Sequence, residues 1–140
     1  MDKINSSQET LYFSNVTGQV IYHPAGYIGI NWFISPLAGA SFREVLEHVL
    51  VLLKQKGLHK IYSDHRGMPP VWIDECAWLL HDWFPRLARE IQYGYCALVQ
   101  DRATIGSAVL HLTLARIDTL PLNVSCFEAS EEALLWLKEV

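Results

Sequence analysis

The chain has 140 residues, of which 51% are hydrophobic and 19% are charged. Such a chain can bury a core of its own, so we expect one domain over residues 1–140 and exclude intrinsic disorder as the main state. The formal net charge of −4 provides no basic excess for a phosphate backbone, so we expect no nucleic-acid partner.

The first residues, 1–9, are polar and mixed in charge, which predicts a loose tail and no secretory signal. The longest aliphatic run, Val49–Leu53, is far shorter than the ~20 residues of a membrane span. The cysteines, Cys76, Cys96 and Cys126, lack the close pairing of zinc sites. We therefore expect a cytoplasmic protein with three reduced, mostly buried thiols, no metal, no cofactor and no membrane span.

The N-terminal part alternates in the manner of strands over residues 10–14, 16–23 and 27–34. A turn or bulge is expected at Asn15 and Gly18, between the first two strands. The third strand carries its apolar side chains at every second position. The three strands are expected to form an antiparallel edge.

A helix is predicted from Ser41, which forms a capping-box pair with Glu44, to a left-handed stop at Gly57. Its core-facing positions are Phe42, Val45, Leu46, Val49, Leu50 and Leu53.

A short strand over Lys60–Asp64 precedes a second predicted helix, over residues 70–90. Pro85 lies inside this helix and is expected to kink it, because proline lacks the amide that would bond the carbonyl of His81. The buried stripe is expected at Ile73, Ala77, Leu80, Phe84, Leu87 and Ile91, widened by Trp72, Cys76 and Trp83.

The nearly continuous apolar run Tyr95–Val99 is typical of a strand that is covered on both faces. A third helix is expected over residues 104–117, a last strand over 122–128, and a fourth helix that Ser130 caps. Strands that alternate with helices predict an α/β fold with a mixed, mostly parallel sheet and four helices.

Three segments together resemble a known family: Ser63-Asp64-His65-Arg66, Trp83-Phe84-Pro85-Arg86, and the stretch from Phe127 to Leu137. In their order and spacing, the residues from Val20 to Val140 resemble the small stand-alone bacterial members of the STAS superfamily. The resemblance implies a STAS-like fold and a protein that acts by binding. In anti-sigma-factor antagonists of this superfamily, a hydroxyl soon after the central strand is phosphorylated. Here residues 65–70 hold no Ser or Thr, so no such switch is expected there.

Polar residues follow three strands that we expect to be parallel. They are Asp64, His65, Arg66, Asp101, Arg102 and Glu128. Because ligands of open α/β sheets bind beyond the carboxyl ends of the strands, near helix N-termini, these residues predict a site for a small anion. The alternative interpretation is local ion pairing, of Asp64 with Arg66 and of Asp101 with Arg102.

Asp64 and His65 also suggest general acid–base chemistry, and with Arg66 they would form the site of a hydrolase. No nucleophile elbow, second histidine at ligand spacing or phosphate loop accompanies them. The alternative is a turn histidine held by hydrogen bonds. Cys76 is interpreted as an inert buried thiol.

Trp78 falls on the polar side of its predicted helix, so another segment covers it or a partner binds it. The helix over residues 104–117 is apolar on two sides, and its second side carries Leu110, Leu114 and Ile117. These residues predict a partner interface and a homodimer. The alternative is that the protein's own core absorbs this second side.

We therefore expect a non-catalytic regulatory or scaffolding module that binds a protein partner or a small anion. A first alternative is a carrier of an apolar or lipid-like ligand, because lipid-transfer folds of the CRAL-TRIO type resemble this arrangement. A second alternative is a hydrolase that uses Asp64, His65 and Arg66.

Overall fold

The computed structural model describes residues 9–33, 39–66, 73–101 and 119–140, which form an α/β fold around one six-stranded mixed sheet. The strands are β1 (Thr10–Ser14), β2 (Gly18–His23), β3 (Tyr27–Trp32), β4 (Lys60–Asp64), β5 (Gly94–Val99) and β6 (Leu122–Phe127). The helical segments are α1 (Gly39–Lys56), α2 (Ile73–Trp78), the π-helical η2 (Leu79–Trp83), α3 (Phe84–Ile91) and α6 (Ser130–Glu139).

The strands lie side by side in chain order, β1-β2-β3-β4-β5-β6. The pairs β1–β2 and β2–β3 are antiparallel, whereas the strands from β3 to β6 run parallel, which confirms the expected sheet. Asn15 makes the first hairpin, because its Oδ1 accepts hydrogen bonds from the amides of Thr17 and Gly18 at 2.8 and 3.2 Å. A β-bulge interrupts β1 between Leu11 and Phe13.

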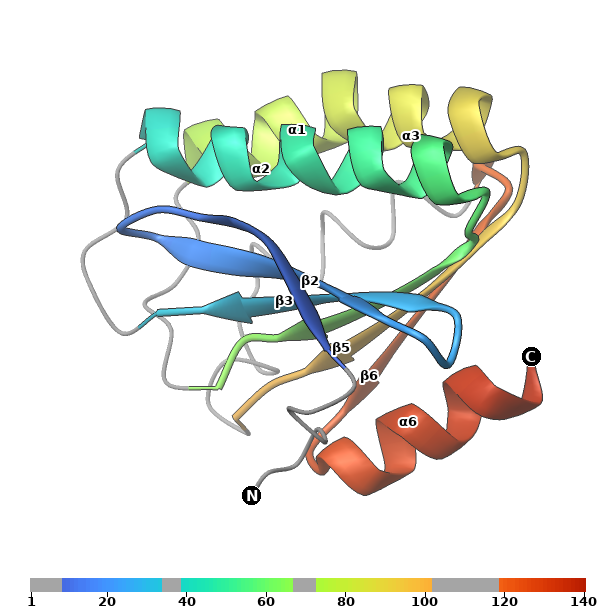
Figure 1. The fold of residues 1–140 in the computed structure, drawn as a ribbon. Coiled ribbons are helices and arrows are strands. Elements are labelled where there is room, and N and C mark those ends of the chain that lie inside the picture. Colours follow the sequence, from blue (N-terminus) through green and yellow to red (C-terminus); the bar gives the residue numbers. More distant parts are fainter. Residues whose placement is uncertain (1–8, 34–38, 67–72, 102–118) are drawn as a thin grey trace.

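Helices cover both faces of the sheet (Figure 1): α1, α2 and α3 lie on one face, and α6 lies on the other. The larger core is therefore the layer between the sheet and α1–α3, and the smaller core lies against α6. The larger core includes Ile28, Ile30, Trp32, Val45, Val49, Leu53, Ile61 and Leu87. The smaller core consists of Tyr27, Tyr62, Ala97, Val99, Ala133 and Leu137.

Every position of the predicted α1 stripe is buried, and Leu52 is buried beside it. The helix ends at Lys56 and Gly57 has φ of +64°, as expected of a left-handed stop. The capping box at Ser41 is a wrong prediction, because α1 begins two residues earlier, at Gly39. Glu44 instead accepts a hydrogen bond from Nδ2 of Asn15, at 3.1 Å, and so connects α1 to the first hairpin.

The helix that contains Pro85 accommodates this residue through the wide turn η2. The amide of Phe84 bonds the carbonyl of Leu79, five residues back, which forms a π-helical turn directly before Pro85. The extra residue shifts the buried face, so that Ala77 is exposed and Leu80 is only partly buried, contrary to the predicted stripe. The buried positions here include Cys76, Trp83, Leu87 and Ile91.

Two further predictions are wrong at the C-terminal end of the chain. The N-cap of α6 is Ala129, which makes no side-chain cap bond, and Ser130 is the first helical residue. Cys126 is exposed, contrary to the expectation that the thiols are mostly buried. The helix expected over residues 104–117 lies outside the described residues. In the described part of the chain, no helix combines the length and the apolar character needed to cross a membrane.

Candidate functional site

The parallel strands end at one edge of the sheet, here called the C-terminal edge: the ends of β3–β6 and the residues directly after them. The register pairs Asn31 with Asp64, Asp64 with Val99, and Val99 with Phe127. The structure thus places Asp64, Asp101 and Glu128 at neighbouring strand ends, and the charge of Asp101 acts on Arg66. The expected convergence of these strand ends is present.

Asp64 holds Arg66 in a fixed orientation at this edge. Nε and Nη2 of Arg66 donate to Oδ1 and Oδ2 of Asp64 at 3.0 and 2.7 Å, and the Arg66 amide also donates to Oδ1, at 3.1 Å. Because of these bonds, Asp64 raises the pKa of Arg66 above its ordinary value. The local ion pair is therefore formed, and Nη1 of Arg66 takes no part in it.

The three residues of the hydrolase hypothesis are divided between the two faces of the sheet. Successive side chains of a strand alternate between faces. Tyr62 belongs to the core against α6, and Asp64 lies on the same face. His65 lies on the other face, with its ring centroid 5.8 Å from that of Trp32. Asp64 is therefore not placed to orient the His65 imidazole, as a catalytic pair would require.

His65 belongs instead to a partly buried polar network with Ser63 and Trp32. Nε1 of Trp32 donates to Oγ of Ser63 at 2.9 Å, and that oxygen lies 2.8 Å from Nε2 of His65. Burial lowers the pKa of His65 from 6.5 to about 4, although the charge of Asp64 opposes this shift. The imidazole is therefore neutral at pH 7 and can accept the Ser63 proton.

Ser63 is the functional candidate that the sequence reasoning missed. It stands two residues before His65, and this spacing places both side chains on one face of a strand. The spacing of two residues in a predicted strand was the only sequence signal that Ser63 and His65 lie together. Ser63 is only 3% exposed, and its hydroxyl already bonds Trp32, so it is poorly placed to attack a substrate.

Gln100 adds a second buried polar group at the C-terminal edge. It directly follows β5 and lies in register with His65, because Asp64 pairs with Val99. The side chain is 1% exposed, and its Oε1 has no hydrogen-bond partner among the described residues. Burying an amide oxygen without a partner costs free energy, but at this exposure the oxygen is out of reach of a ligand from solvent.

The remaining predicted site residues lie apart from this network or outside the described ranges. Asp101 is exposed directly after Gln100. Trp78 is partly buried, and the guanidinium of Arg43 lies 5.1 Å from its ring centroid, so α1 covers part of it. Residues outside the described ranges are Arg102, Leu110, Leu114 and Ile117.

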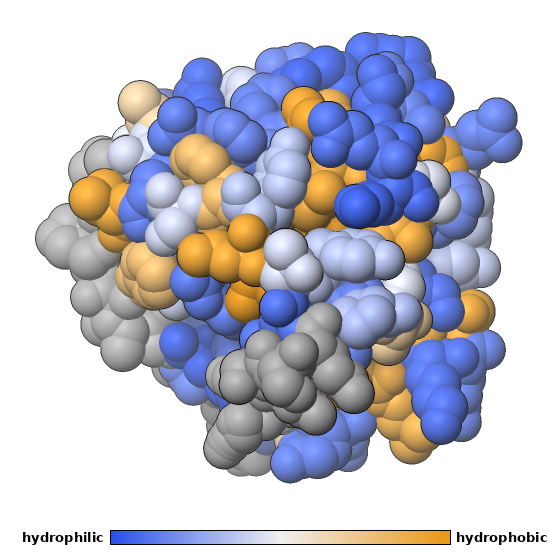
Figure 2. Space-filling model, viewed as in Figure 1, coloured by the Kyte–Doolittle hydropathy of each residue, from blue (hydrophilic) through white to orange (hydrophobic). Residues whose placement is uncertain are grey.

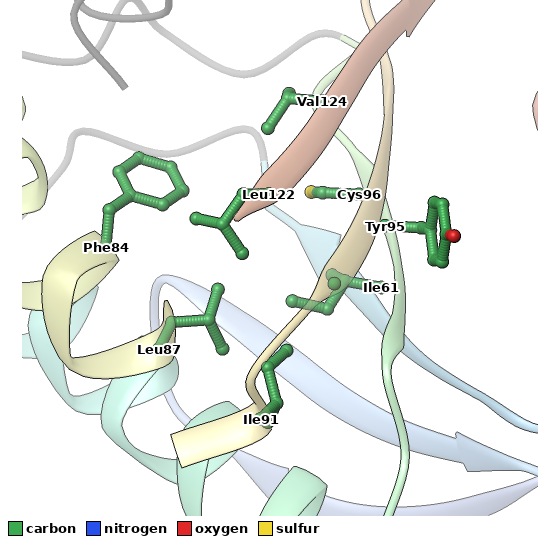
Figure 3. A pocket seen from close by; sticks show the side chains of 9 residues that line it. Ile61, Phe84, Leu87, Ile91, Tyr95, Cys96, Leu122 and Val124 are labelled. Carbon is green, nitrogen blue, oxygen red and sulfur yellow. The ribbon is translucent and has the colours of Figure 1, made fainter. Parts of the chain in front are cut away.

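A small apolar cleft lies between α3 and the strands β4–β6 (Figure 3). Phe84, Leu87 and Ile91 point into it from the helix, whereas the Tyr95 side chain points away from it. The cleft has a volume of about 10 Å³, which is close to the minimum for one water molecule. The strand residues that line it are Ile61, Cys96, Leu122 and Val124.

In the ranges that the structure describes, no three His, Cys, Asp or Glu side chains form a group that could hold a metal ion. Comparison of the chain with protein-family models, with curated proteins and with solved structures gave no match.

Proposed function

We propose that this chain is a STAS-like, non-catalytic binding module that acts in the cytoplasm as a regulatory or scaffolding protein. Two of the resembling segments occupy positions that support the proposal. Ser63–Arg66 stands at the end of a central parallel strand, and Phe127–Leu137 runs from the closing strand into α6. The first segment lies at the C-terminal edge, and the second contributes Ala133 and Leu137 to the core against α6.

The proposed ligand is a small anion that binds Arg66 at the C-terminal edge. The observation that carries this proposal is the bidentate pair with Asp64, which fixes the guanidinium and leaves Nη1 to donate elsewhere. The Arg66 side chain is 33% exposed, so a ligand can reach it. A donor that is already oriented loses little conformational entropy when it binds, and a planar guanidinium suits oxyanions.

The charges around Arg66 restrict what can bind there. Asp64 and Asp101 are acidic, so a diffuse negative charge gains little at this edge. A compact anion that bonds Nη1 directly is favoured over one that relies on long-range attraction. Salt screens the attraction between exposed charges at separations above about 8 Å. A direct hydrogen bond between the anion and Nη1 of Arg66 is much shorter, so salt weakens it less.

Thermal unfolding in the presence of inorganic phosphate, sulfate or citrate tests the proposal. A ligand that binds only the folded state raises the melting temperature with its concentration. We expect at least one of these anions to stabilise the wild type and not Arg66→Ala. Arg89→Ala is the matched control, because Arg89 is an exposed arginine on α3, and this variant should respond as the wild type does. Equal responses of the wild type and Arg66→Ala would reject the anion site.

The structure supports the two alternative functions less well. The apolar cleft beside α3, with a volume of about 10 Å³, is too small for the lipid-like ligand of a carrier. A hydrolase that uses Asp64, His65 and Arg66 needs these side chains to converge, whereas His65 faces away from the other two. Binding at the C-terminal edge therefore remains our proposal.

A further inference from the structure

Strand β1 is an edge of the sheet that pairs with β2 and with no other described strand. An edge strand presents unpaired backbone amides and carbonyls, which form a template for a strand from another chain. In this protein the template lies at the end of the sheet far from β5 and β6 and is independent of Arg66.

The hydrogen-bond pattern of the first hairpin shows which backbone groups point outward. The amide of Asn15 donates to the carbonyl of Gly18 at 3.0 Å, so these residues form a hydrogen-bonded pair. Bonded and non-bonded pairs alternate along antiparallel strands. Ser14, which lies opposite Gln19, therefore belongs to a non-bonded pair, and its amide and carbonyl point away from β2.

Charge does not protect this edge. Natural edge strands commonly carry lysine or other charged residues that prevent pairing. Here the sequence holds no Lys, Arg, Asp or Glu between Glu9 and Arg43, so β1 and its neighbours β2 and β3 are uncharged. An uncharged strand is electrostatically compatible with its own copy, because a two-fold axis would otherwise bring like charges together.

Apolar side chains accompany the free backbone of β1. Leu11 is 58% exposed and Tyr12 is 36% exposed. On the side of the molecule shown in Figure 2, hydrophobic side chains form small separate groups among hydrophilic ones, and β1 lies on this side in Figure 1. Large apolar side chains beside a free strand edge gain from being covered by a partner.

We propose that β1 is a homodimer interface in which two copies pair antiparallel through their β1 strands, about a two-fold axis. The two six-stranded sheets then form one continuous sheet across the dimer. The bulge between Leu11 and Phe13 limits the length of the new ladder, so the dimer is weak and depends on protein concentration. A second copy is the occupant because an antiparallel pair of identical strands closes under two-fold symmetry.

Sedimentation velocity over a wide range of protein concentration tests this interface with two variants. Ser14→Pro removes an outward amide at a position where an edge strand tolerates proline. Leu11→Lys places like charges near the two-fold axis. Val51→Lys adds the same charge to an exposed apolar position of α1 and is the matched control. Circular dichroism establishes that every variant is folded.

The wild type and Val51→Lys are expected to dimerise, and each β1 variant is expected to weaken the dimer at least about tenfold, or about 1.4 kcal/mol. A wild type that stays monomeric at the highest concentration would overturn the proposal. So would a dimer that persists in both folded β1 variants, or a ladder of higher oligomers, which indicates head-to-tail pairing. Arg66 lies outside β1, so a result that rejects the β1 interface does not reject the anion site. A result that rejects the anion site likewise does not reject the β1 interface.

Discussion

The hydroxyl of Ser63 lies 2.8 Å from Nε2 of His65, and the same hydroxyl accepts a hydrogen bond from the indole of Trp32. One oxygen thus connects β3, β4 and the first residue beyond β4. The donor from Trp32 occupies one lone pair, which leaves the Ser63 proton for the neutral imidazole. Burial, which lowers the pKa of His65 to about 4, keeps this imidazole uncharged beside the edge that carries Arg66.

Replacing Ser63 with alanine should destabilise the protein. The Ser63→Ala change leaves the buried indole of Trp32 without its acceptor, which costs about 1–3 kcal/mol. Ser125→Ala on β6 is a matched serine truncation in a strand, and we expect it to change stability by less than about 0.5 kcal/mol. Denaturant unfolding of both variants measures the difference, and equal stabilities would show that the network contributes nothing.

Protonation of His65 should destabilise the folded state in mild acid. The pKa of His65 is about 4 in the folded protein and 6.5 in the unfolded chain, so between these values the unfolded chain binds more protons. The contribution of His65 to the free energy of unfolding is complete above pH 6.5 and decreases as the pH falls toward 4. The full difference amounts to about 3 kcal/mol.

The difference in unfolding free energy between the wild type and His65→Gln isolates this effect from the carboxylates, which titrate in both proteins. The wild type should lose more stability than His65→Gln between neutral pH and pH 4. Parallel pH profiles for the two proteins would contradict the account, as would an NMR titration of His65 at its ordinary pKa.

The sequence predicted those parts of the fold that depend on local periodicity. The alternation in β3 and the helical spacing of α1 identified core residues such as Ile30 and Leu53. The convergence of Asp64 and Asp101 at one edge followed from the parallel order of the strands. These predictions succeeded because neighbours along the chain, or the order of elements, decide them.

The sequence did not predict contacts between residues that are far apart along the chain. Trp32 and Ser63 are 31 residues apart, and no local pattern connects an indole to a particular hydroxyl. Gln100 resembled any polar residue after a strand, and only the register shows it beside His65. Ala77 was wrongly predicted to be buried because a regular helical period does not include the extra residue of the π-helical turn η2.

Truncation of Leu53 tests the packing of α1 against the sheet. Leu53 is fully buried, so Leu53→Ala should cost about 2–5 kcal/mol through lost contacts and a cavity. Val51, two residues away on the same helix, is 44% exposed, and Val51→Ala should cost much less. Chemical denaturation compares the two variants, and similar losses would mean that α1 presents a different face to the sheet.

The three cysteines should differ in their reaction with a thiol reagent. Cys126 is exposed and should be labelled first, whereas Cys76 is buried and should be labelled slowly. Burial raises the pKa of Cys96 to about 12, so little of the reactive thiolate is present there. Mass spectrometry of labelled peptides gives the order, and early labelling of Cys96 or Cys76 would contradict the described packing.

The most direct test of the proposed anion site is NMR detection of the arginine side-chain N–H groups while inorganic phosphate is added. Asp64 fixes the Arg66 guanidinium, so we predict that the Arg66 resonances shift to saturation while those of Arg89 stay in place. Resonances of Arg66 that remain unmoved, or that drift together with those of Arg89, would contradict a binding site at the C-terminal edge.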